Sequence, residues 1–266
     1  MRISIVTSSY NQAKFLPQAL NSVLNQGISD LEFIVVDPGS TDESRELIDS
    51  YGDRIAERIY ARDKGAADGL RNAFRQATGE IYGFLNSDDF LYPGALSAVK
   101  QYFEQHPQVD ILLGDGWIVN GKGEKIRHYR SGCMSPLRYL HGGARWLQQS
   151  TFFRASIYRK TPGFNPYNKS CWDGECLLEM MLAGGRVGYL HQDLGAFRVH
   201  ASSITGSRRI EDIYAADSSR LFERVYGRPR GLYDVAVSKL YKLSYFLLVP
   251  SELVATMRYR IAGRPQ

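Results

Sequence analysis

Two adjacent carboxylates, Asp88 and Asp89, follow the apolar segment Ile81–Leu85 after two polar residues. Such a segment is typical of a buried strand, so we expect both acids at the carboxyl edge of a sheet, where open α/β proteins bind ligands. Adjacent carboxylates repel each other unless a cation joins them. Oxygen ligands favour Mg²⁺ or Mn²⁺, completed by substrate phosphates and water. The alternative is that either acid is the N-cap of a helix carrying the apolar residues of Leu96–Phe103.

The length and composition of the chain limit the elements that can position these acids. With 266 residues, 44% hydrophobic and 23% charged, it can bury one large core or a core with an appendage. No signal segment opens the chain and no apolar run is long enough to span a bilayer, so we expect a cytoplasmic protein. The three cysteines lack metal-ligand spacing. The net charge of +5 is compatible with nucleic acid, an anionic membrane or anionic small molecules.

The first half of the chain alternates predicted strands and helices. The predicted strands are Ile3–Val6, Leu31–Val36, an edge strand near Ile55–Tyr60, and the segment from Ile81. Apolar residues recur at helical spacing within Phe15–Leu24, after the capping sequence Ser40–Glu43, and within Ala66–Ala77. This order predicts an α/β fold with a mostly parallel central sheet and helices on both faces.

Polar residues follow three of these strands, at Thr7–Asn11, at Asp37 and at Asn86–Asp89. Because the carboxyl ends of parallel strands share one edge, the three groups should converge on one crevice. The chain has no glycine-rich dinucleotide or P-loop motif, which argues against a dinucleotide oxidoreductase and a P-loop NTPase. A diphosphate bound at this crevice would therefore need a metal to neutralise it.

Five short motifs in order resemble glycosyltransferase family 2, whose members have the A-type nucleotide-diphospho-sugar transferase fold. They are Ile-Val-Thr-Ser-Ser-Tyr-Asn at 5–11, Phe-Ile-Val-Val-Asp-Pro-Gly-Ser-Thr-Asp at 33–42, Asp-Lys-Gly at 63–65 with Asn72, Ala-Thr-Gly-Glu-Ile at 77–81, and Asn-Ser-Asp-Asp-Phe at 86–90. The resemblance implies an inverting glycosyltransferase domain over 1–205, with a nucleotide-sugar half at 1–115 and an acceptor half at 116–205. Residues 206–266 would form a C-terminal helical extension.

The resemblance also implies how the metal is held. The family's carboxylate motif falls on Ser87, Asp88 and Asp89. Asp89 would ligate Mn²⁺ or Mg²⁺, and Asp88 would face the ribose and could touch the metal through water. In related enzymes a late histidine can complete the metal shell, and His200 is the candidate, with a surface histidine as the alternative. Arg198 is an alternative clamp for a phosphate.

Four residues would form the base pocket by the same resemblance. Tyr10 would pack against the base with Thr7 and Ser9 beside it, and Asp37 would accept a hydrogen bond from the ring imide. The alternatives are a surface aromatic and an ordinary turn aspartate. The family commonly has Pro at position 8 and Gly or Asp at position 38, whereas this chain has Ser and Pro there.

Two charged residues before the metal strand, Lys64 and Asp68, lie where the family often carries a further nucleotide contact. Lys64 would meet a phosphate oxygen, and Asp68 would reach the sugar or a basic partner. A solvated charged turn explains both residues equally well.

The second half of the chain is less regular. Gln148–Phe153 is predicted to be a strand carrying polar groups into the site, and two short strands are predicted at Val187–Leu190 and Leu194–Val199. Between them, Trp-Asp-Gly-Glu at 172–175 resembles the acidic pair that supplies the family's catalytic base. This places the base on Asp173, with Glu175 as a supporting acid or an outward-facing residue of the first helical turn. An inverting transfer needs a base to take the proton of the attacking hydroxyl. The alternative is that both acids only stabilise a helix N-terminus.

From position 211 onward the pattern is helical and basic. Leucines at 240, 243, 247 and 248 occur with Lys239, Lys242, Arg258, Arg260 and Arg264. This mixture is typical of helices on an anionic bilayer, here the inner face of the cell membrane, or of helices that pack on the main domain.

Three function classes fit these features. The first is a metal-dependent glycosyltransferase in cell-surface polysaccharide or glycolipid biosynthesis, with a nucleotide-sugar donor, UDP-linked by resemblance, and a saccharide or lipid-linked saccharide acceptor. A nucleotidyltransferase would carry a basic, glycine-rich loop after the first strand, and Thr7–Asn11 is not one. A non-catalytic sugar-nucleotide binder would have lost the metal motif or the base. The presence of Asp88, Asp89 and Asp173 favours the first class, and no nucleic acid partner is expected.

Overall fold

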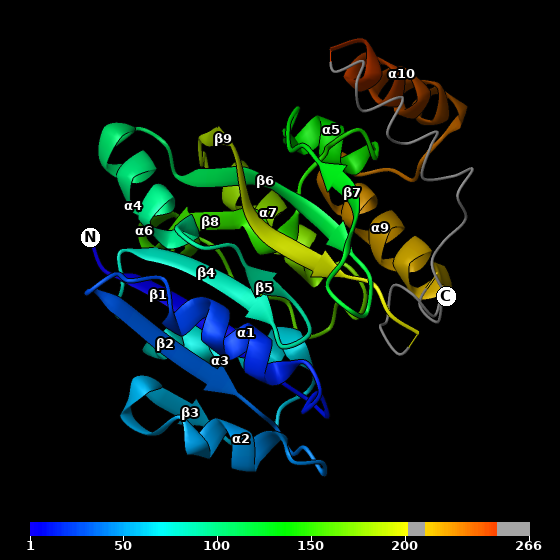
Figure 1. Ribbon diagram of the computed structural model, residues 1–266. Helices are drawn as coiled ribbons and strands as arrows, with labels where there is room; N and C mark the ends of the chain where they lie inside the picture. Colours follow the sequence, from blue (N-terminus) through cyan, green and yellow to red (C-terminus); the bar gives the residue numbers. More distant parts are fainter. Residues whose placement is uncertain (202–210, 249–266) are drawn as a thin grey trace.

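The computed structural model describes residues 1–201 and 211–248 and contains a central sheet of nine strands (Figure 1). Four strands run parallel, in the order β3 (Glu57–Ile59), β2 (Leu31–Val36), β1 (Ile3–Ser8) and β4 (Ile81–Asn86). Ser8 is in register with Val36 on one side and with Asn86 on the other. The predicted convergence of three strand ends is therefore confirmed.

The other half of the sheet is mixed rather than parallel. β8 (Thr151–Arg154) is antiparallel to both β4 and β6 (Ile111–Val119), while β9 (Val187–Arg198) is parallel to β6. β5 (Phe90–Leu91) pairs with β9, and β7 (Lys125–Tyr129) pairs with β6.

Two local predictions for this half are wrong. The strands predicted at Val187–Leu190 and Leu194–Val199 are one strand, β9, whose register shifts opposite Asp115. The strand predicted from Gln148 begins as a short 3-10 helix, η2 (Gln148–Ser150), before β8. A bulge inserts extra residues without ending the strand.

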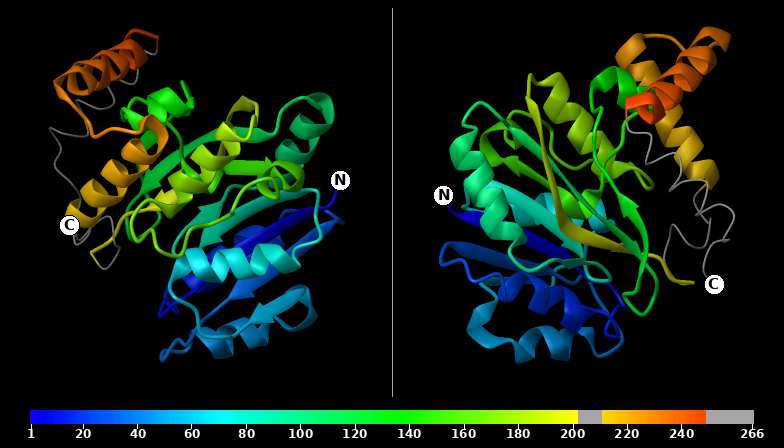
Figure 2. Two further views of the ribbon diagram at one scale, coloured as in Figure 1. Left: turned by 180° about the vertical axis from the view of Figure 1, so that it is seen from behind. Right: turned by 45° about the horizontal axis from the view of Figure 1, so that its top comes forward.

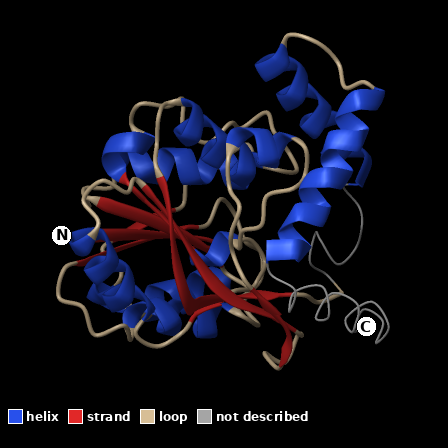
Figure 3. Ribbon diagram, turned by 90° about the horizontal axis from the view of Figure 1, so that it is seen from above, coloured by secondary structure: helices blue, strands red, loops and turns tan. Residues whose placement is uncertain are grey.

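Helices cover both faces of the sheet (Figure 3). Because strand side chains alternate, Val6 and Ile34 point to one face and Ile5 and Phe33 to the other. The first face packs against α3 (Ala66–Gln76), α5 (Pro136–Leu140), α6 (Ala155–Tyr158) and α7 (Trp172–Leu182). The second packs against α1 (Leu16–Leu24), α2 (Ser44–Ser50) and α4 (Ala95–Gln105), with the 3-10 turn η1 (Gly52–Arg54) after α2.

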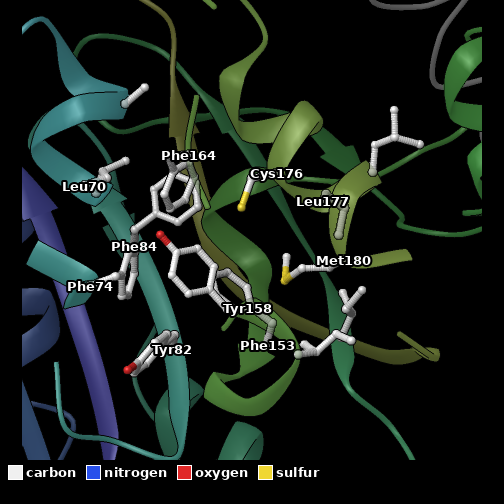
Figure 4. Close-up of a cluster of buried hydrophobic side chains, with 14 of the residues drawn as sticks. Leu70, Phe74, Tyr82, Phe84, Phe153, Tyr158, Phe164, Cys176, Leu177 and Met180 are labelled. Atoms are coloured by element: carbon white, nitrogen blue, oxygen red, sulfur yellow. The ribbon is translucent and has the colours of Figure 1, made fainter. Parts of the chain in front are cut away.

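An aromatic cluster forms the centre of the first face (Figure 4). Phe74 of α3 stacks on Phe164 at 5.8 Å between ring centroids, and Tyr82 of β4 meets Tyr158 of α6 at 5.8 Å. These rings join the parallel strands to the elements of the second half, so that both halves share one core.

The alternative that Asp88 or Asp89 begins a helix is wrong. Both residues precede β5, and α4 begins later, after Gly94 in the left-handed conformation with φ of 78°. The acids must therefore be explained by what surrounds them at the sheet edge.

Two C-terminal helices, α9 (Glu211–Tyr226) and α10 (Leu232–Leu248), end the described chain (Figure 2). Leu221 and Phe222 of α9 are buried in the first-face cluster, so α9 is part of the main core and not a detachable appendage. Residues 202–210 and 249–266, including Arg258, Arg260 and Arg264, lie outside the described residues. No helix in the described ranges is long and apolar enough to cross a membrane.

Candidate active site

The turn after β4 presents the two aspartates in different ways. Ser87 N donates to Ser8 O at 3.1 Å and Asp89 N donates to Asn86 O at 3.1 Å, which ties the turn to the end of β1 and closes it on itself. Ser87 is buried, Asp88 is partly exposed, and Asp89 is 1% exposed. Only Asp88 therefore lies open at this edge.

The carboxylate of Asp89 accepts hydrogen bonds from other groups of the protein. Its Oδ1 accepts from Arg198 N at 2.8 Å, and its Oδ2 accepts from Gln149 Nε2 at 2.6 Å and Asn86 Nδ2 at 3.3 Å. Burial, and then the charge of Asp88, raises the pKa of Asp89 well above its ordinary value. Donors thus reach both oxygens of Asp89, and the role of Asp89 as a metal ligand stays a prediction.

Arg198 is buried and forms hydrogen bonds within the protein, which differs from the phosphate-binding role considered from the sequence. Its side chain is 1% exposed and lies against the rings of Phe15 and Phe90, at 4.9 and 5.4 Å from their centroids. Its Nε donates to Asp88 O at 2.6 Å, and its Nη2 donates to Gln18 Oε1 at 2.5 Å. Arg198 therefore fixes the turn that presents Asp88.

His200 pairs with Asp88, and its role as a metal ligand stays a prediction. Its Nε2 lies 3.1 Å from Asp88 Oδ2, and its side chain is 8% exposed beside Phe15, with 4.6 Å between ring centroids. His191 instead pairs with Asp115 at 3.1 Å. A carboxylate oxygen and an imidazole nitrogen are both suitable ligands for Mn²⁺ or Mg²⁺. Within the described ranges, no group of three or more such side chains converges on a metal position.

Two hydroxyls of the loop after β1 are buried without a partner. Thr7 and Ser9 are 0% exposed, and neither side-chain oxygen has a hydrogen-bond partner among the described residues. Tyr10, between Ser9 and Asn11, is 59% exposed. Buried hydroxyls are normally satisfied, so these two stand out, and their place beside a nucleotide base stays a prediction.

The same loop is fastened to the loop after β2. Asn11, which has a positive φ of 52°, donates from its N to Ser40 Oγ at 2.8 Å and accepts at Oδ1 from Thr41 N at 2.8 Å. Asp37 is fully buried, and its carboxylate accepts from Ser40 N at 2.8 Å and from Arg45 Nε at 3.2 Å. Its contact with a base stays a prediction, since its observed bonds shape the loop.

Of the two charged residues at the start of α3, Lys64 precedes the helix and Asp68 lies in its first turn. Asp68 is 8% exposed, and its carboxylate accepts from Lys64 N at 3.1 Å and from Arg71 Nη2 at 2.8 Å. The side chain of Lys64 is exposed. Lys169, which sequence reasoning missed, donates from Nζ to Lys64 O at 2.8 Å. It comes from an irregular loop about a hundred residues later, so no local pattern marked it.

A cavity of about 380 Å³ opens beside this turn. It lies at the ends of β2 and β3 against α3 and is lined by Val36, Ile59, Asp63, Gly69 and Asn72, among others. Burial raises the pKa of the Asp63 carboxyl, and the charges of Asp68 and Asp37 act in the same direction. The cavity therefore adjoins the loops that carry the predicted base-binding residues.

Asp173 stands in the first turn of α7, and packing fixes that turn over β4. Trp172 contacts Phe84 of β4 at 5.6 Å and Phe164 at 5.7 Å between centroids, so this Trp is a packing residue. The side chain of Asp173 is partly exposed, but the protein atoms around its carboxyl bury that group. This burial raises the pKa of Asp173 to about 6. The Gly174 N–H, which donates to Asp173 Oδ1 at 2.8 Å, acts to lower the pKa. Such a carboxyl can exchange a proton near neutral pH.

Glu175 is a structural anion and not a supporting acid. Its two oxygens accept from Arg220 Nη1 at 3.2 Å and Nη2 at 2.8 Å, and Asn168 Nδ2 donates to Oε2 at 2.7 Å. Burial acts to raise the pKa of Glu175, but these hydrogen bonds outweigh it and the pKa is lowered. Glu175 therefore joins α9 to α7 directly behind Asp173.

A family model described as Glycosyl transferase family 2 matches residues 4–162. A glycosyltransferase of Nostoc sp., described as uncharacterized, is 27% identical over 215 residues, which cover 76% of this chain and 66% of that protein. A PGL/p-HBAD biosynthesis glycosyltransferase of Mycobacterium bovis is 33% identical over 169 residues, 62% of either chain. The chain thus spans about two thirds of the length of these relatives.

Two solved structures share the fold. TarS from S. aureus, residues 1–349 in complex with UDP-GlcNAc, aligns with a TM-score of 0.69 and 19% identity over 92% of this chain and 72% of that one. The mannosyltransferase PcManGT from Pyrobaculum calidifontis, in complex with GDP-Man and Mn²⁺, aligns with a TM-score of 0.64 and 17% identity over 99% and 76%. These matches confirm the predicted nucleotide-diphospho-sugar transferase fold.

Proposed function

This chain belongs to glycosyltransferase family 2, and from that premise we propose that it moves a sugar from a UDP-linked donor to an acceptor hydroxyl with inversion at the anomeric carbon. The observation that carries the proposal is the pairing of Asp88 Oδ2 with His200 Nε2 at 3.1 Å. The two residues are 112 positions apart in sequence and follow the ends of β4 and β9. They meet at the edge of the sheet where its polar loops lie.

We assign the metal to Asp88 and His200 and a structural role to Asp89. Asp88 and His200 offer one oxygen and one nitrogen ligand, and the diphosphate and water would complete the shell. When bound, Mn²⁺ or Mg²⁺ supplies positive charge for the leaving diphosphate. PcManGT, solved in complex with Mn²⁺, supports this use of a metal by a protein of the same fold.

The chain's own residues perform the remaining steps. Tyr10, Thr7 and Ser9 bind the nucleotide, since the two hydroxyls have no partner within residues 1–201 and 211–248 and the exposed ring offers a stacking face. Asp173 accepts the proton of the attacking hydroxyl, and its pKa of about 6 keeps the carboxylate ionised at neutral pH while leaving it basic enough to take a proton. The buried Arg198 holds the turn of Asp88 in place.

The acceptor we propose is a saccharide or lipid-linked saccharide used in cell-surface polysaccharide or glycolipid assembly. The support is the relative named for PGL/p-HBAD biosynthesis, together with the family itself. For an acceptor of this kind, we place the protein in the cytoplasm at the inner face of the cell membrane.

A panel of nucleotide sugars tests the donor. Purified protein is mixed with UDP-linked, GDP-linked and other nucleotide sugars, with and without Mn²⁺, and its melting temperature is measured. A UDP-linked donor with Mn²⁺ should give the largest rise, because only binding to the folded state stabilises it. A larger rise with GDP-linked donors, the class bound by PcManGT, would overturn the base assignment.

The non-catalytic binder is the remaining alternative. It predicts the same melting shifts but no release of UDP from the donor. The nucleotidyltransferase alternative loses its support once the chain is placed in this family.

A further inference from the structure

One face of α10 carries a row of aliphatic side chains that are exposed in the described part of the chain. The residues of this leucine row follow one another at helical spacing of three or four: Leu232, Ala236, Leu240, Leu243 and Leu247. Its four leucines are more than half exposed, at 91% for Leu232, 64% for Leu240, 56% for Leu243 and 72% for Leu247. Periodic exposure of this kind is typical of an amphipathic helix whose apolar face no described residue covers.

The opposite face of α10 fixes its orientation. Tyr245 is 1% exposed, and its hydroxyl donates to Arg130 O at 3.0 Å. Ser244 Oγ accepts from Arg138 Nη1 at 3.1 Å. Asp234 lies 3.3 Å from His141 Nε2. Because these bonds hold the helix on the segment 130–145, the leucine row must face outward, and Figures 1 and 2 show α10 at an outer corner of the molecule.

The exposed charges on α10 are positive. Lys239 and Lys242 are exposed beside the leucine row. The one acidic residue of the helix, Asp234, is 2% exposed and is held by Arg228, with Nη2 to Oδ1 at 2.9 Å. Hydrogen bonding from Arg228 strongly lowers the pKa of Asp234, so it remains an internal counter-ion. A partner surface that binds this face should therefore be apolar where it contacts the leucine row and negatively charged where it contacts the two lysines.

We propose that the leucine row docks on an anionic phospholipid bilayer, with α10 lying along the interface and Lys239 and Lys242 at headgroup level. Tyr233, which is 75% exposed at the start of the helix, has the amphipathic ring favoured at that depth. A second copy of the chain fits less well. Symmetric pairing about the middle of the row would set the lysines of the two copies against each other.

This inference goes beyond the transfer reaction and does not depend on it. Membrane docking concerns α10, whereas donor binding concerns the loops at the sheet edge. An Asp173→Asn variant should bind vesicles as the wild type does, so a failure of the proposed function and a failure of docking are told apart.

Vesicle cosedimentation of the full chain tests the proposal. The wild type should bind vesicles of phosphatidylcholine with phosphatidylglycerol and should bind phosphatidylcholine alone poorly. Leu240→Ser combined with Leu243→Ser should lower the partition coefficient at least about tenfold, since two leucines no longer enter the acyl boundary. Leu182→Ser, an exposed leucine of α7, is the matched control and should change it little. Lys239→Gln with Lys242→Gln should remove most of the preference for anionic vesicles.

Three results would overturn the proposal. The first is a wild type that binds no vesicle. The second is a double leucine variant that binds as the wild type does. The third is a wild type that sediments as a dimer, with the double variant a monomer and neither bound to vesicles, which would assign the leucine row to a second copy of the chain.

Discussion

At the scale of single residues, Asp88 and Asp89 are neighbours in sequence with opposite surroundings. Asp89 faces inward and receives three hydrogen bonds, while Asp88 faces His200. The sequence could show that two carboxylates end a strand, but not which of them turns inward. That choice depends on Arg198 and Gln149, which come from strand and turn elements far along the chain.

Substitution of the two aspartates should have different effects on stability and on the metal-dependent melting shift. Asp88→Asn should leave the melting temperature of the protein alone nearly unchanged and remove the Mn²⁺-dependent part of the shift caused by UDP. Asp89→Asn should lower the free energy of unfolding by about 1–3 kcal/mol without any ligand, because a buried acceptor becomes a donor facing other donors. The roles would have to be exchanged if only Asp89→Asn removed the metal-dependent shift while preserving stability.

The unpartnered hydroxyl of Thr7 allows a second test at this scale. Thr7→Val removes a buried polar atom that has no partner in the described part of the chain, so the unfolding free energy should hold or rise by up to about 1 kcal/mol. Affinity for UDP, measured by calorimetry, should fall.

Thr151→Val is the matched control for Thr7→Val. It deletes the hydrogen bond from Thr151 Oγ1 to Leu147 O at 2.8 Å and should cost about 1 kcal/mol with no effect on UDP affinity. If Thr7→Val behaves like this control, the Thr7 hydroxyl does not bind nucleotide.

At the scale of elements, α9 braces α7, the helix that carries Asp173. Asp217 accepts from Lys169 N at 3.1 Å and Ser170 Oγ at 2.7 Å, and Arg220 grips Glu175 beside Asp173. The sequence predicted a helix from Glu211, and the structure contains one that packs into the main core, while the domain boundary at 205 stays a prediction. Its contacts with α7 span some fifty residues, and helical spacing alone does not identify such partners.

Arg220→Ala should destabilise the protein by about 1–3 kcal/mol at pH 7, because Glu175 would keep its charge without its main partner. The pKa of Glu175 is lowered in the folded state from an ordinary 4.5, so its stabilising contribution exists above that value and disappears as the pH falls through the folded pKa. The difference from the wild type in denaturant titrations should therefore shrink below about pH 4.5.

Arg224→Ala supplies the control for Arg220→Ala. It lies about one turn along α9 and pairs with the more exposed Glu179, so its loss should cost at most about 1 kcal/mol. The bracing role of Glu175 would be contradicted if both variants lost the same free energy of unfolding. It would also be contradicted if the loss of unfolding free energy in Arg220→Ala did not change with pH.

At the scale of the whole molecule, the regular half of the sheet could be predicted and the mixed half could not. The βα alternation of the first half has local signals in its strand composition and helical spacing, and its strands pair in parallel as expected. The antiparallel entry of β8 between β4 and β6, and the bulge in β9, depend on pairing between segments far apart in sequence. Those pairings place His200 beside Asp88 and complete the site.

The proposed transfer requires one proton acceptor at the junction of the two halves. The measurement that tests this most directly is the pH dependence of UDP release from the best donor of the panel, in the wild type and in Asp173→Asn. The wild-type rate should rise as the pH increases through about 6, where Asp173 loses its proton, and then level off.

In Asp173→Asn the rate should fall by about 10²–10⁴-fold and lose that rise, while the melting shift caused by UDP with Mn²⁺ is retained. An Asn variant that releases UDP at the wild-type rate, with the same pH profile, would contradict the account.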